Sequence, residues 1–190
     1  MPTVITHPVV PVALAISLGR SLVSGRLLAV GVVASILPDL DMLAFRYGIP
    51  YAHDFGHRGA SHSLALALLL GVLAAAGFKW LKARPWMAFA FVFISAASHP
   101  LLDMITHGGL GVALFWPFSS ERLHFPVQVL EAAPFRLEQL MGAPGQRVLL
   151  LELYWVWLPA FSAAFFLALS RWAVCAVRSL RRKNRHGPVP

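Results

Sequence analysis

The stretch WMAFAFVFISAASHPLLDMI, residues 86–105, combines a long apolar run with a histidine and an aspartate near its end. As an α-helix, a run of this length measures about 30 Å, which matches the hydrocarbon core of a bilayer. His99 and Asp103 are four positions apart, so their side chains leave one face of the helix. The stretch therefore predicts a membrane-spanning helix with a polar pair at one end.

Composition favours a membrane protein over the whole chain. Hydrophobic residues make up 58% of the 190 residues, against roughly 45–50% in soluble domains. The net charge is +8, but the basic residues cluster at the ends of apolar runs, so nucleic-acid binding is not expected. Cys175 is the only cysteine, which excludes an internal disulfide and cysteine-rich zinc modules. A metal site would have to use histidine and carboxylate ligands.

Five apolar segments predict an all-α polytopic membrane protein. They cover residues 8–18, 27–37, 63–81, 86–105 and 148–177. The first two are shorter than the roughly 20 residues that cross a bilayer, so we expect them to form a short helical hairpin. The third and fourth have near-spanning length, and the fifth is long enough to cross with tilt.

Residues 106–147, between the fourth and fifth segments, are rich in glycine and proline and too polar to span. They predict a surface loop with an interfacial amphipathic helix around residues 127–140. Residues 1–177 then form a single membrane-embedded domain that carries the candidate metal site. The basic residues 178–190 are expected to form a disordered cytoplasmic tail.

Alternation of the segments sorts the charges to two sides of the membrane. The larger basic group consists of Arg20, Arg26, Lys79, Lys82, Arg84, Arg178, Arg181, Arg182, Lys183 and Arg185. The smaller group consists of Arg46, Arg58, Arg122, Arg136 and Arg147, and it shares its side with every acid and with every histidine except His186. The positive-inside rule places the larger group in the cytoplasm. We therefore expect the acids and these histidines to face the non-cytoplasmic side.

Four separate places on the chain bring metal-ligand-type residues to this second side. They are His7, Asp39 and Asp41 in LPDLD, His57 and His62 in HRGASHS, and His99 and Asp103 in SHPLLD. After Pro38, an extended chain would turn Asp39 and Asp41 to the same side. Ser61 is a candidate N-cap of the third segment.

The ligand types indicate a hard or borderline divalent metal. A charged side chain at membrane depth costs several kcal/mol unless it is paired or coordinated. A single buried histidine is as readily a hydrogen-bonded core residue, but several ligand-type residues converging on one face favour metal binding. Imidazole and carboxylate ligands suit Zn²⁺, Mn²⁺ or Fe²⁺, and we expect one or two ions of zinc or manganese.

The motifs resemble those of the YdjM-like family of inner-membrane metal-dependent hydrolases. The resemblance runs through Thr6-His7, LPDLD, HRGASHS and SHPLLDMITHGG, with WPF following at residues 116–118. It implies a metal site built from His7, Asp39, His57, His62, His99 and Asp103, and it does not extend to His107. It also implies a bacterial inner-membrane protein, so the non-cytoplasmic side of the metal site would be the periplasmic side. The His99–Asp103 spacing is also loosely similar to that of zinc-dependent phospholipase C, which points to phosphoester chemistry.

The expected activity is metal-assisted hydrolysis of a phospholipid or another lipid-linked phosphoester at the non-cytoplasmic face. Asp41 is the candidate general base. Arg58 either binds a substrate phosphate or serves as an interfacial anchor. The sequence lacks the HExxH and G-x-S-x-G motifs, which argues against a zincin protease and a serine hydrolase.

A metal-binding transporter or sensor without hydrolytic activity is the alternative. Transport requires a polar route to the opposite face, yet polar residues thin out along the cytoplasmic half of the segments. That pattern favours the enzyme. A structural membrane protein with a stabilising metal is a third interpretation of the same ligand set.

Overall fold

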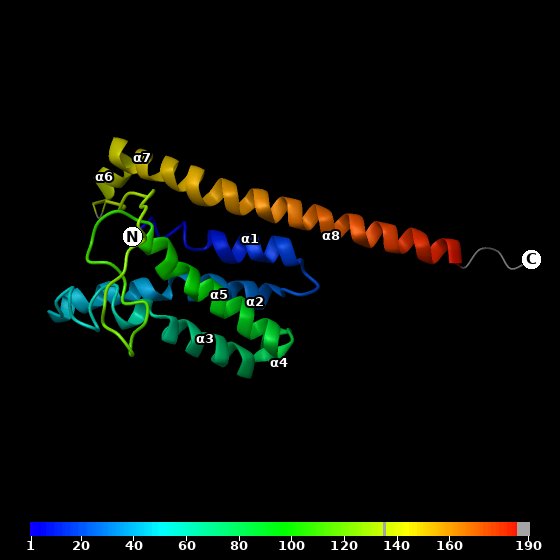
Figure 1. Cartoon of the computed structure of the whole chain (residues 1–190), viewed down its shortest axis with the longest axis horizontal. Helices are drawn as coiled ribbons and strands as arrows, with labels where there is room; N and C mark the ends of the chain where they lie inside the picture. Colours follow the sequence, from blue (N-terminus) through cyan, green and yellow to red (C-terminus); the bar gives the residue numbers. More distant parts are fainter. Residues whose placement is uncertain (135, 186–190) are drawn as a thin grey trace, which may run out of the picture.

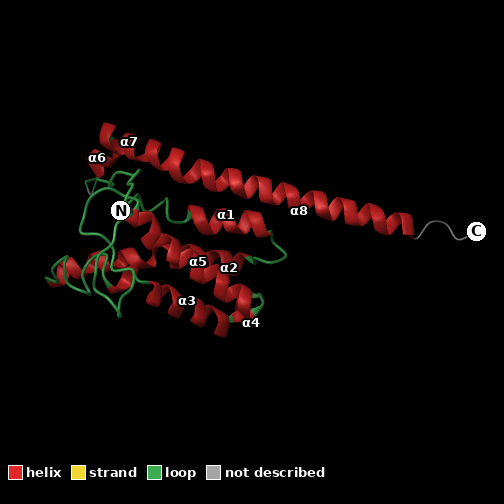
Figure 2. Ribbon diagram, in the orientation of Figure 1, coloured by secondary structure: helices red, strands yellow, loops and turns green. Residues whose placement is uncertain are grey.

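The computed structural model describes residues 1–134 and 136–185, and its regular elements are helices joined by turns and loops (Figures 1 and 2). Within these residues, β-structure is limited to isolated bridges such as Thr106 with Leu130. Three helical stretches among them are long and apolar enough to cross a membrane: Gly25–Tyr47, Pro85–Met104 and Ala143–Arg178. The expected all-α membrane fold is confirmed.

Five helices lie side by side along the long axis of the molecule (Figure 1). They are α1 (Val9–Leu18), α2 (Gly25–Ile36), α3 (Leu64–Ala76), α5 (Pro85–Met104) and α8 (Leu158–Arg185). A short helix, α4 (Phe78–Leu81), follows α3. The loops that follow α2 and α5 meet near the N-terminus at one end, whereas the α1–α2 turn and the C-terminus lie toward the other (Figure 1).

Helix α5 is the central element, because it packs against α1, α2 and α3. Phe91 and Val92 are buried in a core that also holds Leu27 of α2 and Ala67 of α3. Small residues allow the close approach, as is common where helices meet in membranes. A methyl group at Gly31 of α2 would overlap the Phe91 ring.

The second segment differs from its expected form. Helix α2 continues directly into a 3₁₀ helix, η1 (Leu37–Tyr47), and together they make a helical stretch of 23 residues that is apolar on average. The extended geometry expected for Asp39 and Asp41 is therefore wrong. Successive residues of a 3₁₀ helix are about 120° apart, so these two carboxylates point to different neighbours.

The third segment also departs from the sequence expectation. Its helix breaks at Gly77 into α3 and α4, so α3 has only 13 residues. Ser63, not Ser61, caps α3, and its hydroxyl accepts a hydrogen bond from the Leu66 N–H. The Ser61 hydroxyl instead donates to Asp41 Oδ2 at 2.5 Å.

Residues 127–133 are not part of the expected amphipathic helix. They cross the end of α5, where the His107 N–H donates to the Leu130 carbonyl at 2.7 Å. The Leu130 side chain is buried with Val9, Leu102 and Val156. Pro126 and Pro134 flank this stretch, and a proline disfavours helical geometry at the residue before it. An extended path is therefore favoured here. Helix forms only later, as α6 (Leu137–Met141) and α7 (Ala143–Glu152).

The fifth segment is a continuous helical rod. Helix α7 passes through a π-helical turn, η3 (Leu153–Trp157), into α8. Helix α8 extends to Arg185, so residues 178–185 are helical where a disordered tail was expected. The rest of that tail, residues 186–190, lies outside the described residues.

Candidate metal centre

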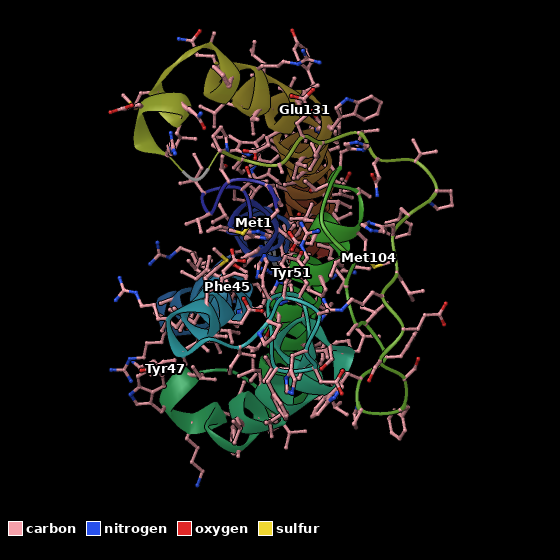
Figure 3. All side chains as sticks on the ribbon, turned by 90° about the vertical axis from the view of Figure 1, so that its left-hand side faces the viewer. Met1, Phe45, Tyr47, Tyr51, Met104 and Glu131 are labelled. Atoms are coloured by element: carbon pink, nitrogen blue, oxygen red, sulfur yellow. The ribbon has the colours of Figure 1, made fainter. Side chains whose placement is uncertain are left out.

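Elements from four parts of the chain deliver the six predicted metal-site residues to one end of the bundle. His7 precedes α1, Asp39 lies in η1, and His57 and His62 lie in or beside the short 3₁₀ helix η2 (Ala60–His62). His99 and Asp103 lie in the last turns of α5. Figure 3 looks onto this end, where Met1, Phe45, Tyr51 and Met104 surround the middle of the view.

All six side chains are removed from solvent. His7, His62, His99 and Asp103 are 0% exposed, and His57 is 3% exposed. The Asp39 side chain is 8% exposed. Burial of this many ionisable groups is costly unless they are paired or coordinated. The cluster is thus no ordinary solvated surface patch.

The orientation of His99 is fixed by the backbone of α2. Its Nδ1 lies 2.7 Å from the Ser35 carbonyl oxygen, which can only accept. Nδ1 therefore carries the proton, and the Nε2 lone pair points into the cluster. His62 is held in a similar way, because its Nδ1 lies 3.0 Å from Asp41 Oδ2.

The two Nε2 atoms of His62 and His99 face each other at 3.0 Å. Two nitrogen lone pairs at this distance repel unless a proton or a cation lies between or beside them. Asp39 Oδ1 lies 3.4 Å from His99 Nε2, and Asp103 Oδ2 lies 3.4 Å from His62 Nε2. Bonds of about 2.1 Å to a divalent cation place neighbouring ligand atoms roughly 3.0–3.4 Å apart.

Several buried polar atoms in the cluster have no hydrogen-bond partner. They are both ring nitrogens of His7, both carboxylate oxygens of Asp39 and one oxygen of Asp103. The His7 ring stacks on His99 with centroids 3.7 Å apart, and its Nε2 lies 3.8 Å from Asp39 Oδ2. Unsatisfied buried groups are rare in proteins. Ligand atoms of His7, His99 and Asp103 lie close enough together to hold a metal ion, as do those of Asp39, His57 and His62.

His57 stands apart from the other five residues. Its Nδ1 lies 2.7 Å from Asp41 Oδ1, and it also lines a cavity that opens beside the cluster. Asp41 itself is fully engaged, because its second oxygen accepts from Ser61, from the Arg58 N–H and from His62. Asp41 thus ties His57 and His62 together.

Arg58 is buried at 1% exposure, although it carries a permanent charge. Its Nε donates to Asp103 Oδ2 at 2.9 Å, and its Nη1 donates to the Gly108 carbonyl at 3.0 Å. Its backbone has a φ of 62°, an unusual conformation for a residue other than glycine. These contacts identify Arg58 as an internal residue of the site, which excludes the role of interfacial anchor.

The cavity beside the cluster has a volume of about 140 Å³, and its lining includes Tyr51, His57, Arg58 and Gly109. A methyl group at Gly109 would come within 2.7 Å of the Tyr51 hydroxyl and 2.8 Å of Arg58 Nη1. Only glycine leaves room here, and its φ of 81° also favours glycine. Sequence reasoning missed Tyr51, which no motif signalled.

Arg122 holds the segment that carries Tyr51 and His57. Its guanidinium donates to the backbone carbonyls of Tyr51, His53 and His57 at distances of 3.0–3.1 Å. The same group lies over the Tyr51 ring. One wall of the cavity is therefore fixed by a side chain from the long loop between α5 and α6.

A second buried polar group supports His7 and was also missed by sequence reasoning. Glu152, 1% exposed at the end of α7, accepts hydrogen bonds from the Thr3 N–H at 2.5 Å and from the Thr6 hydroxyl at 2.6 Å. The Trp157 indole donates to the Thr6 hydroxyl oxygen at 2.8 Å. The available signal was an acid inside the fifth apolar segment.

The remaining polar residues of this end stay outside the cluster. His53 is exposed, and His107 and His124 both contact the Gln128 side chain near the surface. None of them belongs to either group that could hold a metal ion within the described residues.

Burial lowers the pKa of both His7 and His62, which lie outside the spanning stretches, but their neighbours act on them differently. Burial, aided by the neighbouring His99, lowers the pKa of His7 well below its ordinary value. Burial also lowers the pKa of His62, but hydrogen bonds with Asp103 and Asp41 outweigh it and raise the pKa to about 9. A proton on His62 thus occupies the gap between the two Nε2 atoms when no cation does.

Comparison with known proteins supports the family resemblance. The family model described as YdjM inner membrane protein matches residues 1–177. The inner membrane protein YbcI of Escherichia coli (strain K12) is 43% identical over 160 residues, covering 84% of this chain and 92% of that protein. No solved structure matches. Neither name states an activity or a ligand.

Proposed function

This chain belongs to the YdjM inner membrane protein family, and we propose that it is a membrane-embedded, metal-dependent hydrolase of a phospholipid or another lipid-linked phosphoester. The observation that carries the proposal is the pair of imidazole Nε2 atoms 3.0 Å apart in a cluster with unpartnered His7, Asp39 and Asp103 atoms. A divalent cation would replace the proton between the two Nε2 atoms and supply the partners that the other atoms lack.

His7, Asp39, His62, His99 and Asp103 would hold the metal. Nitrogen and carboxylate donors suit zinc or manganese, and His57 would join only if a second ion binds beside Asp39 and His62. A divalent ion held there would polarise a phosphoryl oxygen and lower the pKa of water to about 7. Asp41 and the Ser35 carbonyl support the proposal, because they fix the two histidines that face each other.

The small cavity would receive the phosphate of the substrate. Arg58 lines it with a buried guanidinium, and the Tyr51 hydroxyl lies close to the same point. A guanidinium next to a hydroxyl recognises a phosphate through charge-assisted hydrogen bonds. The contact with Asp103 couples this subsite to the ligand cluster.

His57 is better placed than Asp41 to accept the proton of the attacking water. Both Asp41 oxygens already accept hydrogen bonds, and Asp41 is not among the residues that line the cavity. His57 lines the cavity and has its Nδ1 held by Asp41, so Nε2 is the atom that would take the proton. Asp41 orients this ring, as the carboxylate does in other histidine–carboxylate pairs.

The site would face the periplasm. The basic residues concentrate at the opposite end of the bundle, and the positive-inside rule puts that end in the cytoplasm. A lipid-linked substrate would then come from the outer leaflet. For the rival function, a transporter, ions would need a path through the core around Phe91, Val92 and Ala96, which is apolar.

Turnover by metal-loaded protein in nanodiscs decides between these functions. A panel of phospholipids and lipid-linked phosphates is incubated with the protein, and released products are identified by mass spectrometry. We expect Gly109→Ala to retain metal but lose turnover, because the new methyl group occupies the phosphate subsite. Gly48→Ala is the matched control: Gly48 also has a positive φ, but no atom lies within 4 Å of its added methyl group.

Two results would contradict the proposal. One is equal turnover in the Gly109 and Gly48 variants, which would show that the small cavity does not bind the substrate phosphate. The other is metal-loaded wild type that hydrolyses no member of the panel but moves metal ions across proteoliposomes, which would replace the hydrolase with the transporter.

A further inference from the structure

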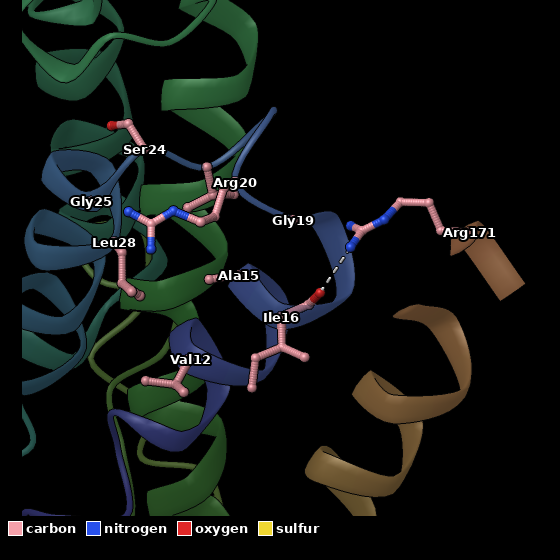
Figure 4. Close-up of a pocket in the computed structure, with 10 residues that line it drawn as sticks. Val12, Ala15, Ile16, Gly19, Arg20, Ser24, Gly25, Leu28 and Arg171 are labelled. Atoms are coloured by element: carbon pink, nitrogen blue, oxygen red, sulfur yellow. Dashed lines mark hydrogen bonds between the residues drawn. The ribbon is translucent and has the colours of Figure 1, made fainter. Parts of the chain in front are cut away.

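A cavity of about 400 Å³ lies among α1, α2 and α8, at the end of the bundle opposite the metal centre (Figure 4). Its inner part is lined by apolar residues of α1 and α2, among them Val12, Ala15 and Leu28. At its mouth stand Arg20, from the α1–α2 turn, and Arg171, from α8. Figure 4 shows the Arg20 side chain lying over Gly25 and Leu28, with Arg171 approaching α1 from the other side.

The mouth of this cavity carries positive charge without a counterion. No acidic residue lines it among the described residues. The acids of the chain all belong to segments that the topology places toward the metal-centre end. Arg20 is exposed and forms no ion pair within the described part of the chain. Two cations above an apolar pocket make a surface complementary to an anion with a hydrocarbon tail.

Arg171 holds its position through the end of α1. Its guanidinium donates to the Ser17 carbonyl at 2.6 Å and lies 3.5 Å from the Ile16 carbonyl. A methyl group at Gly19 would come within 2.5 Å of the same guanidinium, so glycine at this turn leaves it room. The contact ties α8 to α1 and keeps a cation at the mouth of the cavity.

We propose that this cavity binds an anionic phospholipid of the leaflet that borders this end. The lipid phosphate would lie between Arg20 and Arg171, and the upper part of an acyl chain would pack on Val12, Ala15 and Leu28. The position fits such a ligand, because Arg20 lies in the turn after α1 and Arg171 contacts the last turn of α1, at the end of the bundle where the basic residues gather. This inference is independent of the hydrolase, since it concerns the opposite end of the molecule.

Lipid retention tests the proposal with a charge-matched pair of variants. Purified protein is exposed to mixed micelles of phosphatidylglycerol and phosphatidylethanolamine, and bound lipid is counted by native mass spectrometry. We expect Arg20→Gln to weaken retention of phosphatidylglycerol about fivefold, the value of one basic residue at an anionic lipid surface. Arg26→Gln removes an equal charge from the same end, but Arg26 does not line the cavity, so retention should hardly change.

A second variant separates the apolar part of the site from its charge. Ala15→Leu fills the inner cavity and keeps both arginines, and it should also weaken phosphatidylglycerol retention. The midpoint of thermal unfolding in detergent serves as the fold check for each variant, because it does not depend on the proposed metal centre. Equal losses in the Arg20 and Arg26 variants, or unchanged retention in the Ala15 variant, would overturn the proposal in favour of general surface attraction.

Discussion

At the scale of single residues, His99 and Asp103 test whether the cluster binds metal. We expect His99→Ala and Asp103→Ala to weaken metal binding by more than the 10–100-fold that loss of an outer-shell partner costs. His107→Ala is the matched control, because His107 lies only a few residues further along the chain but contacts Gln128. Elemental analysis of purified proteins measures the effect. Full metal content in the first two variants would show that the α5 pair is structural.

Asp41 and His57 separate metal binding from proton transfer. Asp41→Asn should weaken metal binding about 10–100-fold, because Asp41 orients His62. His57→Gln should keep one metal ion and lower turnover roughly 10²–10⁴-fold, as expected for loss of a general base. Titration with metal and turnover assays on both variants distinguish the two roles. Unchanged turnover in the His57 variant would show that another group is the general base.

Protons should compete with metal at His62. Hydrogen bonds with Asp103 and Asp41 raise its pKa to about 9 in the metal-free protein, so it is protonated at neutral pH. Metal binding requires the neutral ring, and affinity should therefore rise with pH until about pH 9. The charged ring stabilises the metal-free fold at low pH, and this contribution is lost as pH rises through about 9. Calorimetry in buffers of different ionisation enthalpy should detect a released proton at pH 7.

At the scale of secondary-structure elements, Glu152 couples the fifth segment to the segment that carries His7. Glu152→Gln should cost roughly 1.5–3 kcal/mol of stability, the value of hydrogen bonds to a buried charged group, and should weaken metal binding because His7 loses its support. Glu131→Gln is the control: its ion pair with Arg147 is exposed and should contribute less than about 1 kcal/mol. Unfolding in detergent by denaturant measures both. Equal stability of the two variants would contradict the coupling.

The elements also show what sequence could predict. Apolar length and the alternation of segments predicted the pooling of ligand residues at one end, because topology follows from few features. The directions of Asp39 and Asp41 could not be predicted, since they depend on a 3₁₀ continuation of α2. Ser63 caps α3 in place of the expected Ser61, because the Ser61 hydroxyl donates to Asp41. Long-range partners of this kind leave no local pattern in the sequence.

At the scale of the whole molecule, orientation is open to a direct measurement. Cys175 is exposed and must first be replaced by serine. A single cysteine at Ser119, in the loop after α5, should then react with a membrane-impermeant reagent in intact spheroplasts. A cysteine at Lys82 should react only after permeabilisation, because it lies in the basic turn between α4 and α5. The reverse pattern would place the metal centre in the cytoplasm.

The short helices α1 and α3 have a consequence for the surrounding membrane. Their 10 and 13 residues measure about 15 and 20 Å, against about 30 Å for the hydrocarbon core. His7 and His62 stand at the starts of these helices, whose other ends reach the basic interface. Hydrophobic mismatch of this size is relieved by thinning of the bilayer. In the proposed periplasmic orientation, the outer leaflet would dip over the candidate centre, so that a lipid substrate of the proposed hydrolase would reach the metal without leaving its leaflet.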